Sequence, residues 1–153
     1  MQLTRNFSTR EFTKSNIATR LGIDNGLTSE HLDNLKALCE NILQPLRDEL
    51  KMPIRITSGY RSKALNDAIG GSSSSQHCKA EAADLELWVN GVERNDLLYH
   101  TIVKMELPFD QLIWEFGDDE NPNWVHVSYG PRNRKQKLQA YKDDNNRTKY
   151  RAI

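Results

Sequence analysis

The stretch Ser75-Gln76-His77-Cys78-Lys79-Ala80-Glu81-Ala82-Ala83-Asp84-Leu85-Glu86-Leu87-Trp88-Val89 joins a polar loop to an alternating pattern that is typical of a β-strand. In a strand over residues 83–89, successive side chains point to opposite faces, so Asp84, Glu86 and Trp88 are predicted to share one face. His77 precedes Asp84 by seven positions. An imidazole and a carboxylate therefore flank the start of this predicted strand.

Two further strands are predicted downstream. The run Trp124-Val125-His126-Val127-Ser128-Tyr129 alternates, so His126 is expected on the face opposite to the two valines. The run 110–116 is largely apolar and places Glu115 near its end. Chemically reactive side chains are thus expected on the outward faces of three strands.

Two imidazoles and one carboxylate make a ligand set for zinc, because catalytic zinc sites hold three protein ligands and leave a fourth position to water. His77, Asp84 and His126 supply that set. Spacing alone is a weak signal in a chain with 4 histidines and 21 acidic residues. His31 and His100 fall in predicted helices and are interpreted as residues without a metal role.

These motifs, taken in order, resemble the M15-type zinc peptidases, which include D-Ala-D-Ala carboxypeptidases and phage endolysins. Their pattern is Ser-x-His, six residues, Asp, and a distant His on a strand. The resemblance covers nearly the whole chain, and its N-terminal part is similar to the short, single-domain phage branch. The matching segments are residues 6–12, 23–25, 58–62, 65–66, 70–71, 75–77, 82–84, 109–113 and 124–129.

The resemblance implies that His77, Asp84 and His126 are the zinc ligands. It also implies that Arg61 holds an anionic part of the substrate or polarises its carbonyl group, and a planar guanidinium can bind a carboxylate with two parallel hydrogen bonds. A surface arginine that caps a turn is the alternative for Arg61. Ser75 and Gln76, which precede the first ligand, are predicted substrate contacts.

The sequence departs from the family pattern at two positions. Many relatives carry an acidic residue three positions before the last ligand, where this chain has Asn123, and an amide cannot accept a proton from water. Glu115 is therefore predicted as the general base, since the related hedgehog domain also carries its zinc-site glutamate at the end of such a strand; Glu120 is the second candidate. Ala80 replaces a usual glycine, and a positive φ there would be strained.

The order of elements predicts an α+β fold in which a small antiparallel sheet carries the zinc site and N-terminal helices flank it, as in hedgehog and D-Ala-D-Ala peptidase domains. Thr28 is expected to cap a helix of regularly spaced leucines, which Pro45 should kink or end early. A strand over 54–57 is predicted next. Ser62 should then cap a short helix that ends at Gly70-Gly71.

Composition favours one zinc peptidase domain over residues 1–153, with 37% hydrophobic residues. The chain is expected to be a monomer. A formal net charge of +0 gives no indication that the partner is a nucleic acid or an anionic membrane. The segment 132–153 is the exception, because it holds eight Lys and Arg against two Asp. That excess could bring the chain to an anionic cell wall, although a solvated tail is the usual explanation.

No N-terminal apolar segment resembles a signal peptide, and no run approaches the length of a membrane span. The chain is therefore expected to be made in the cytoplasm and, as for holin-dependent phage lysins, to reach the wall through a membrane pore formed by another protein. Cys39 is expected to be a buried thiol. Cys78 is a minor candidate for metal contact, because Asp84 already completes the ligand set.

The implied function is zinc-dependent hydrolysis of a peptide bond in the stem peptide of bacterial peptidoglycan, with Glu115 as base. An L-Ala-D-Glu endopeptidase and a D-Ala-D-Ala carboxypeptidase share these motifs, so the bond stays open. The alternative is a non-catalytic zinc-containing module that binds the wall or a protein. Arg61 and Glu115 favour the enzyme, whereas Asn123 favours the module.

Overall fold

A six-stranded sheet with the strand order β10-β9-β7-β8-β4-β3 organises the computed structural model, which describes residues 1–153. The predicted strands at residues 54–57, 110–116 and 124–129 are present with slightly different ends. The strands of this sheet are β3 (Arg55–Ser58), β4 (Ala82–Glu86), β7 (Gln111–Glu115), β8 (Trp124–Ser128), β9 (Gln136–Lys142) and β10 (Thr148–Ala152).

The sheet is mixed, so the expectation of an antiparallel sheet is wrong at one pair of strands. β9 runs parallel to β7, whereas every other neighbouring pair is antiparallel. β8 pairs with one side of β7, and the chain then crosses to the other side through residues 129–135. After that crossing β9 points in the same direction as β7.

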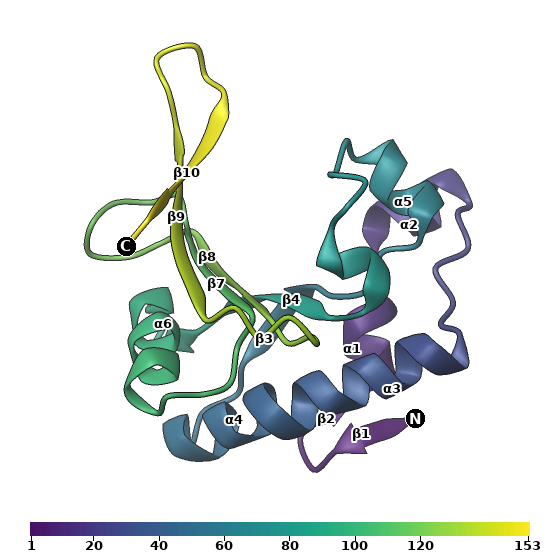
Figure 1. Ribbon diagram of the computed structural model, residues 1–153. Coiled ribbons are helices and arrows are strands. Elements are labelled where there is room, and N and C mark those ends of the chain that lie inside the picture. Colours follow the sequence, from purple (N-terminus) through teal and green to yellow (C-terminus); the bar gives the residue numbers. More distant parts are fainter.

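A long helical segment runs below the sheet in Figure 1 and comprises α3 (Ser29–Leu38), a π-helical turn (Cys39–Leu43) and α4 (Gln44–Leu50). Thr28 caps it as predicted, because its hydroxyl accepts the His31 N–H. Pro45 does not end the helix, which continues to Leu50. The N–H of Gln44 bonds to the carbonyl of Cys39, so a wider turn directly precedes the proline that lacks an N–H.

The hydrophobic core lies between this long helix, α6 (Asn95–Lys104) and one face of the sheet. Val125 and Val127 of β8 are fully buried there, as their alternation with His126 predicted. The other apolar contributors include Leu35, Leu38, Ile42, Leu43, Leu46, Leu85, Leu98, Ile102, Leu112 and Trp114. One face of the sheet is thus occupied by packing, and the opposite face carries the polar side chains.

The smaller elements complete the chain around the sheet. Ser62 caps α5 as predicted, and the chain turns at Gly70 with a φ of +74°. Figure 1 shows α5 and α2 together on one side and the β9–β10 hairpin rising on the other. These elements are β1 (Gln2–Thr4), β2 (Phe7–Ser8), α1 (Thr9–Thr13), α2 (Asn16–Leu21), α5 (Lys63–Ala68), a 3-10 turn (Gln76–Lys79), β5 (Trp88–Val89) and β6 (Val92–Glu93).

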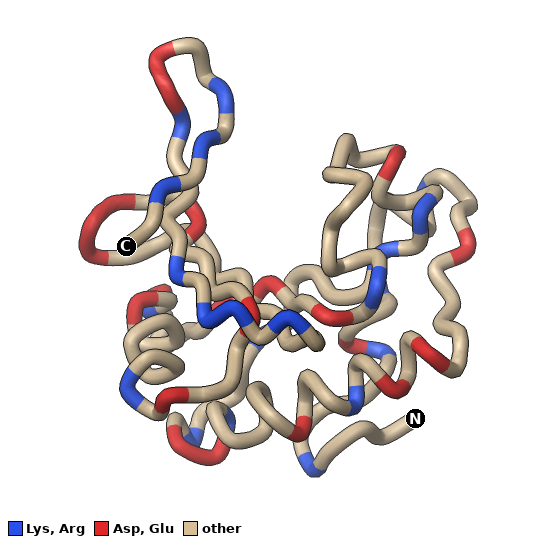
Figure 2. Tube along the Cα trace, in the orientation of Figure 1, with Lys and Arg blue, Asp and Glu red and all other residues tan.

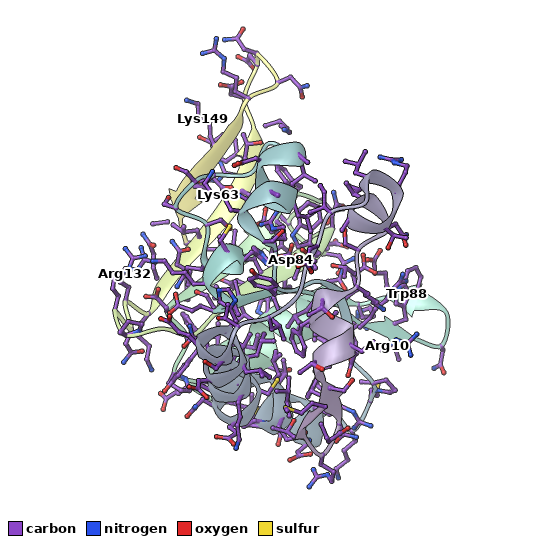
Figure 3. The ribbon with its side chains drawn as sticks, turned by 90° about the vertical axis from the view of Figure 1, so that its right-hand side faces the viewer. Arg10, Lys63, Asp84, Trp88, Arg132 and Lys149 are labelled. Atoms are coloured by element: carbon purple, nitrogen blue, oxygen red, sulfur yellow. The ribbon has the colours of Figure 1, made fainter.

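The strand predicted over residues 83–89 ends at Glu86, and the prediction that Trp88 shares the face of Asp84 is wrong. Trp88 pairs with Glu93 in the separate β5–β6 hairpin and its side chain is half-exposed. Figure 3 shows Trp88 at the edge of the molecule, away from the central Asp84. Leu87, which lies between β4 and β5, is fully buried, so the sequence continues to alternate between apolar and polar residues although the sheet has ended.

The basic segment 132–153 is not a solvated tail. It contains β9 and β10, a hairpin that extends the central sheet along the free side of β7. Figure 2 shows its Lys and Arg residues along both strands and its acidic residues at the tip. None of the helices has the length and apolar character that crossing a membrane requires.

Candidate metal centre

Strand pairing brings together two candidate ligands that lie 42 positions apart in sequence. In the β4–β8 register Asp84 lies directly opposite His126, on the face turned away from the core valines. Directly paired side chains on one face of a sheet lie about 5 Å apart. The observed distance from Asp84 Oδ1 to His126 Nδ1 is 3.2 Å. Hydrogen-bonding register therefore fixes two thirds of the ligand set.

His77 joins this pair from the 3-10 turn. Its Nε2 atom lies 3.3 Å from Asp84 Oδ1, and one candidate ligand atom from each of His77, Asp84 and His126 lies within 4.8 Å of the other two. The structure thus brings together the three residues that the sequence analysis singled out. Cys78, the minor candidate for metal contact, is not in this cluster.

The orientation of the His77 ring is set by a backbone carbonyl. His77 Nδ1 lies 2.7 Å from the carbonyl oxygen of Gly59, and with Nδ1 donating this bond, Nε2 is the ring nitrogen that faces Asp84 and that becomes a metal ligand when it loses its proton. Gly59 itself packs so closely on α1 that an added Cβ would lie 2.6 Å from the Cα of Phe12. The N-terminal helix thereby positions the carbonyl that orients the first ligand.

The 3-10 turn that carries His77 is held at both ends. The Ser75 hydroxyl accepts the His77 N–H at its start. Ala80, at its end, has a φ of +60°, so the chain keeps at this position the left-handed conformation that is strained for an alanine. A left-handed conformation costs an alanine about 1–2 kcal/mol, and the full burial of Ala80 in the core shows what holds it there.

An ion pair that the sequence analysis missed anchors this turn to the sheet. Asp110 is fully buried and accepts two hydrogen bonds from the Arg134 guanidinium, each 2.9 Å long, and one from Gln76 Nε2. The Arg134 hydrogen bonds hold the pKa of Asp110 down, at about 2. The available signal was an aspartate directly before an apolar strand, but its arginine partner lies 24 positions away.

The pKa values of two carboxyl groups at the site, those of Asp84 and Glu115, are shifted in opposite directions. Burial acts to raise the pKa of Asp84, but the charge of His77 and the hydrogen bonds from both histidines outweigh it and hold that pKa well below its usual range. Burial raises the pKa of Glu115 to about 7, with the nearby charge of Asp84 adding to the shift and His126 opposing it. Glu115 is also on the His126 face of the sheet, two residue pairs further along β7 and β8.

A cavity of about 630 Å³ opens beside the histidines. Arg61, Ser75, Gln76, His77 and His126 line it, whereas Asp84 and Glu115 do not. Sequence analysis did not foresee the other wall of the cavity, because the strands that form it are polar and alternate weakly. The unforeseen lining residues are Arg132, Arg134, Leu138, Thr148 and Tyr150, and Gln111 and Ile113 of β7 line the cavity beside them.

The predicted substrate contacts differ in how many of their hydrogen-bonding groups are already engaged within the chain. Arg61 donates one hydrogen bond to the Ser75 hydroxyl at 3.3 Å, and its buried Nε has no partner. The Gln76 amide nitrogen is engaged with Asp110, so its hydrogen bonds serve the structure of the turn. The second candidate base, Glu120, is exposed in the loop after β7, and Asn123 is tied by its N–H to the Glu115 carbonyl.

The sequence profile of the Peptidase M15 family matches residues 5–128, which include the whole ligand cluster. This chain belongs to the Peptidase M15 family. The resemblance noted from the sequence motifs is thereby confirmed, and the chain is a metallopeptidase. No curated protein matches the chain in a sequence search. The M15 match ends with β8, so the β9–β10 hairpin lies beyond it.

Peptidases of the M15 family are typically zinc-dependent, and the cluster fits that ion. Zinc takes imidazole nitrogen and carboxylate oxygen in tetrahedral geometry. His77 presents the ring nitrogen that its bond to Gly59 leaves free, and Asp84 is held ionised by its neighbours. With three protein donors, one coordination position would stay open on the cavity side.

Proposed function

We propose that this M15 metallopeptidase uses zinc to hydrolyse a peptide bond in the stem peptide of bacterial peptidoglycan. The observation that carries the proposal is the cluster of His77, Asp84 and His126 beside a cavity whose wall holds Arg61. The cavity volume of about 630 Å³ suits a short peptide. A metal-ligand set and a cationic anchor thus face the same space.

The chemistry divides between the ion and the chain's own residues. Zinc, when bound by the three ligands, would activate a water molecule and polarise the scissile carbonyl. Glu115 would accept the proton of the attacking water and return it to the leaving amine, as a carboxylate within hydrogen-bond reach can. Its buried position and its pKa of about 7 support this role, because a base that must take and release a proton works best near the ambient pH.

The charge around the cavity supports an anionic substrate. Arg61 lies on one wall and Arg132 on the other, in the loop that precedes β9. Figure 3 shows Arg132 at the end of the molecule opposite to Trp88. Peptidoglycan stems carry free carboxylates at their D-Glu residue and at their terminal D-Ala. Arg61 would bind one of these groups with paired hydrogen bonds from its guanidinium, because this side chain lines the cavity.

The bond that is cut is either L-Ala-D-Glu or D-Ala-D-Ala, and the biological setting that we propose is a phage endolysin. The similarity of the N-terminal motifs to the short, single-domain phage branch supports that setting. In it, a monomeric chain made in the host cytoplasm would reach the wall through a membrane pore formed by another protein.

The test is mass spectrometry of purified peptidoglycan after digestion by the zinc-loaded protein, with a chelator-stripped sample beside it. New peptide termini that disappear on chelation would establish the peptidase and name the bond. The matched variant is Glu115→Gln, which should keep bound zinc and lose at least about 100-fold in kcat. Absence of zinc-dependent products from several wall types would overturn the peptidase and favour the non-catalytic module. Unchanged turnover in Glu115→Gln would remove only the assignment of the base.

A further inference from the structure

The C-terminal hairpin carries a tyrosine into the neighbourhood of the metal centre. Tyr150 of β10 lines the same cavity as His77 and His126, although the M15 match ends 22 positions earlier, at residue 128. Leu138 and Thr148 from the same hairpin also line this cavity. The hairpin therefore forms one wall of the site, and Tyr150 contributes a phenol hydroxyl group to that wall.

Strand register explains why Tyr150 faces the site. Glu115 of β7 lies opposite Ala140 of β9, and Ala140 lies opposite Tyr150 of β10. Directly paired residues project from the same face of a sheet, so all three share the face that carries His126. The middle member of the row is an alanine. Only a methyl group thus stands between Glu115 and Tyr150 in this row.

Electrostatics agrees with this placement. Tyr150 is about half-exposed; the partial burial of its side chain raises its pKa, and the charges of Glu115 and Asp84 raise it further. Those two carboxylates act on the phenol only because it lies near them. A raised pKa also keeps the hydroxyl protonated at neutral pH, so that it is a hydrogen-bond donor. Its hydroxyl donates no hydrogen bond within the chain, whereas the Thr19 hydroxyl donates one to the Ser15 carbonyl.

We infer that Tyr150 is a catalytic residue that donates a hydrogen bond from its hydroxyl to the substrate oxygen that gains negative charge in the transition state. This inference rests on the proposed peptidase function. Donors aimed at developing charge stabilise a transition state more than the bound substrate, so their loss lowers kcat more than it raises KM. Arg61 approaches the cavity from the opposite wall, and the two donors would enclose the reacting group between them.

The test compares Tyr150→Phe with Tyr141→Phe on the peptidoglycan fragment that the wild-type protein hydrolyses. Tyr141 is a matched control, because it lies in the same hairpin with its ring on the opposite face, 4.6 Å from the Arg151 guanidinium. Tyr150→Phe should lower kcat by about 10- to 100-fold with little change in KM. Tyr141→Phe should match the wild-type protein. Both variants should keep their melting temperature and zinc content.

Equal kcat in Tyr150→Phe and wild type would overturn the inference, and so would a loss confined to KM. If the wild-type protein hydrolyses no wall peptide, the proposed function fails, and binding then tests Tyr150 separately. Calorimetry would use a phosphinate dipeptide, which imitates the charged transition state, and the corresponding plain dipeptide. Selectively weaker phosphinate binding by Tyr150→Phe supports the inference, and equal binding overturns it.

Discussion

Asp84 and Glu115 lie on one face of the same sheet, yet their pKa values move in opposite directions. Asp84 lies between two imidazoles, 3.2 and 3.3 Å from their nitrogens, and these favour its charged form. Glu115 is buried, and its carboxyl group receives no hydrogen bond from the chain, so burial favours its neutral form. Paired carboxyl groups with separated pKa values are typical of sites that need one fixed charge and one movable proton.

The raised pKa of Glu115 predicts a pH-dependent stability of the metal-free chain. The folded-state pKa of about 7 exceeds the ordinary 4.5, so the folded state holds a proton that the unfolded state releases between these values. The contribution of Glu115 to the free energy of unfolding is therefore largest below pH 4.5 and is lost as the pH rises through 7. Glu115→Gln should raise the free energy of unfolding by about 2 kcal/mol at pH 8.

Chemical denaturation of both metal-free proteins at pH 8 and at pH 5 measures this effect. At pH 5 the carboxyl group is mostly protonated in the folded state, so the difference should shrink to a small remainder. An equal difference at the two pH values would show that packing, and not the ionisation of Glu115, separates the two proteins.

At the scale of elements, the long helix ends in a strained residue. Lys51 caps α4 with a φ of +57°, a left-handed conformation that favours glycine, and its side chain is exposed. Lys51→Gly should therefore increase the free energy of unfolding by about 0.5–1 kcal/mol, seen as a higher melting temperature.

Lys36→Gly is the matched control for this substitution. Lys36 is exposed within α3, where glycine costs about 1 kcal/mol, so the same replacement should lower stability there. A destabilising effect at both positions would contradict the assignment of strain to Lys51.

The elements also show how far local pattern predicts structure. Alternation placed His126 opposite its neighbouring valines, and hydroxyl caps located helix starts at Thr28 and Ser62, because each signal acts within a few residues. The expectation that Pro45 could end the helix early was wrong, because a π-helical turn precedes the proline and the helix continues to Leu50. The hairpin was read as a tail because the pattern Gln136-Lys137-Leu138-Gln139 is mostly polar, and only its pairing with β7 makes it a strand.

At the scale of the whole molecule, the candidate metal ligands come from three elements, of which β8 lies far from the other two in sequence, so metal binding would be coupled to folding. The unfolded chain holds the same residues without their geometry, and a ligand that binds only the folded state stabilises it. Zinc at about 100 times its dissociation constant should add about 2.7 kcal/mol to the free energy of unfolding. In a chain of 153 residues that is a rise in melting temperature of roughly 5–10 °C, reversed by a chelator.

Asp84→Ala should abolish this zinc-dependent rise, measured by differential scanning calorimetry with and without metal. His31→Ala is the matched control, because His31 is a histidine outside the cluster that takes part in the α3 cap and contacts Tyr60. This variant should melt at a lower temperature and still show the full zinc increment. A zinc increment that survives in Asp84→Ala would exclude Asp84 from the ligand set.

The sequence by itself determined the family, the residue types of the candidate metal site and the faces of Asp84 and His126 in their strands, because motif order and side-chain alternation are local properties of the chain. Only the tertiary structure decided which wall faces the metal centre, that Asp110 and Arg134 join the ligand turn to the sheet, and that Tyr150 lies in line with Glu115. These relations depend on strand order and register, which arise from pairing between residues far apart in sequence.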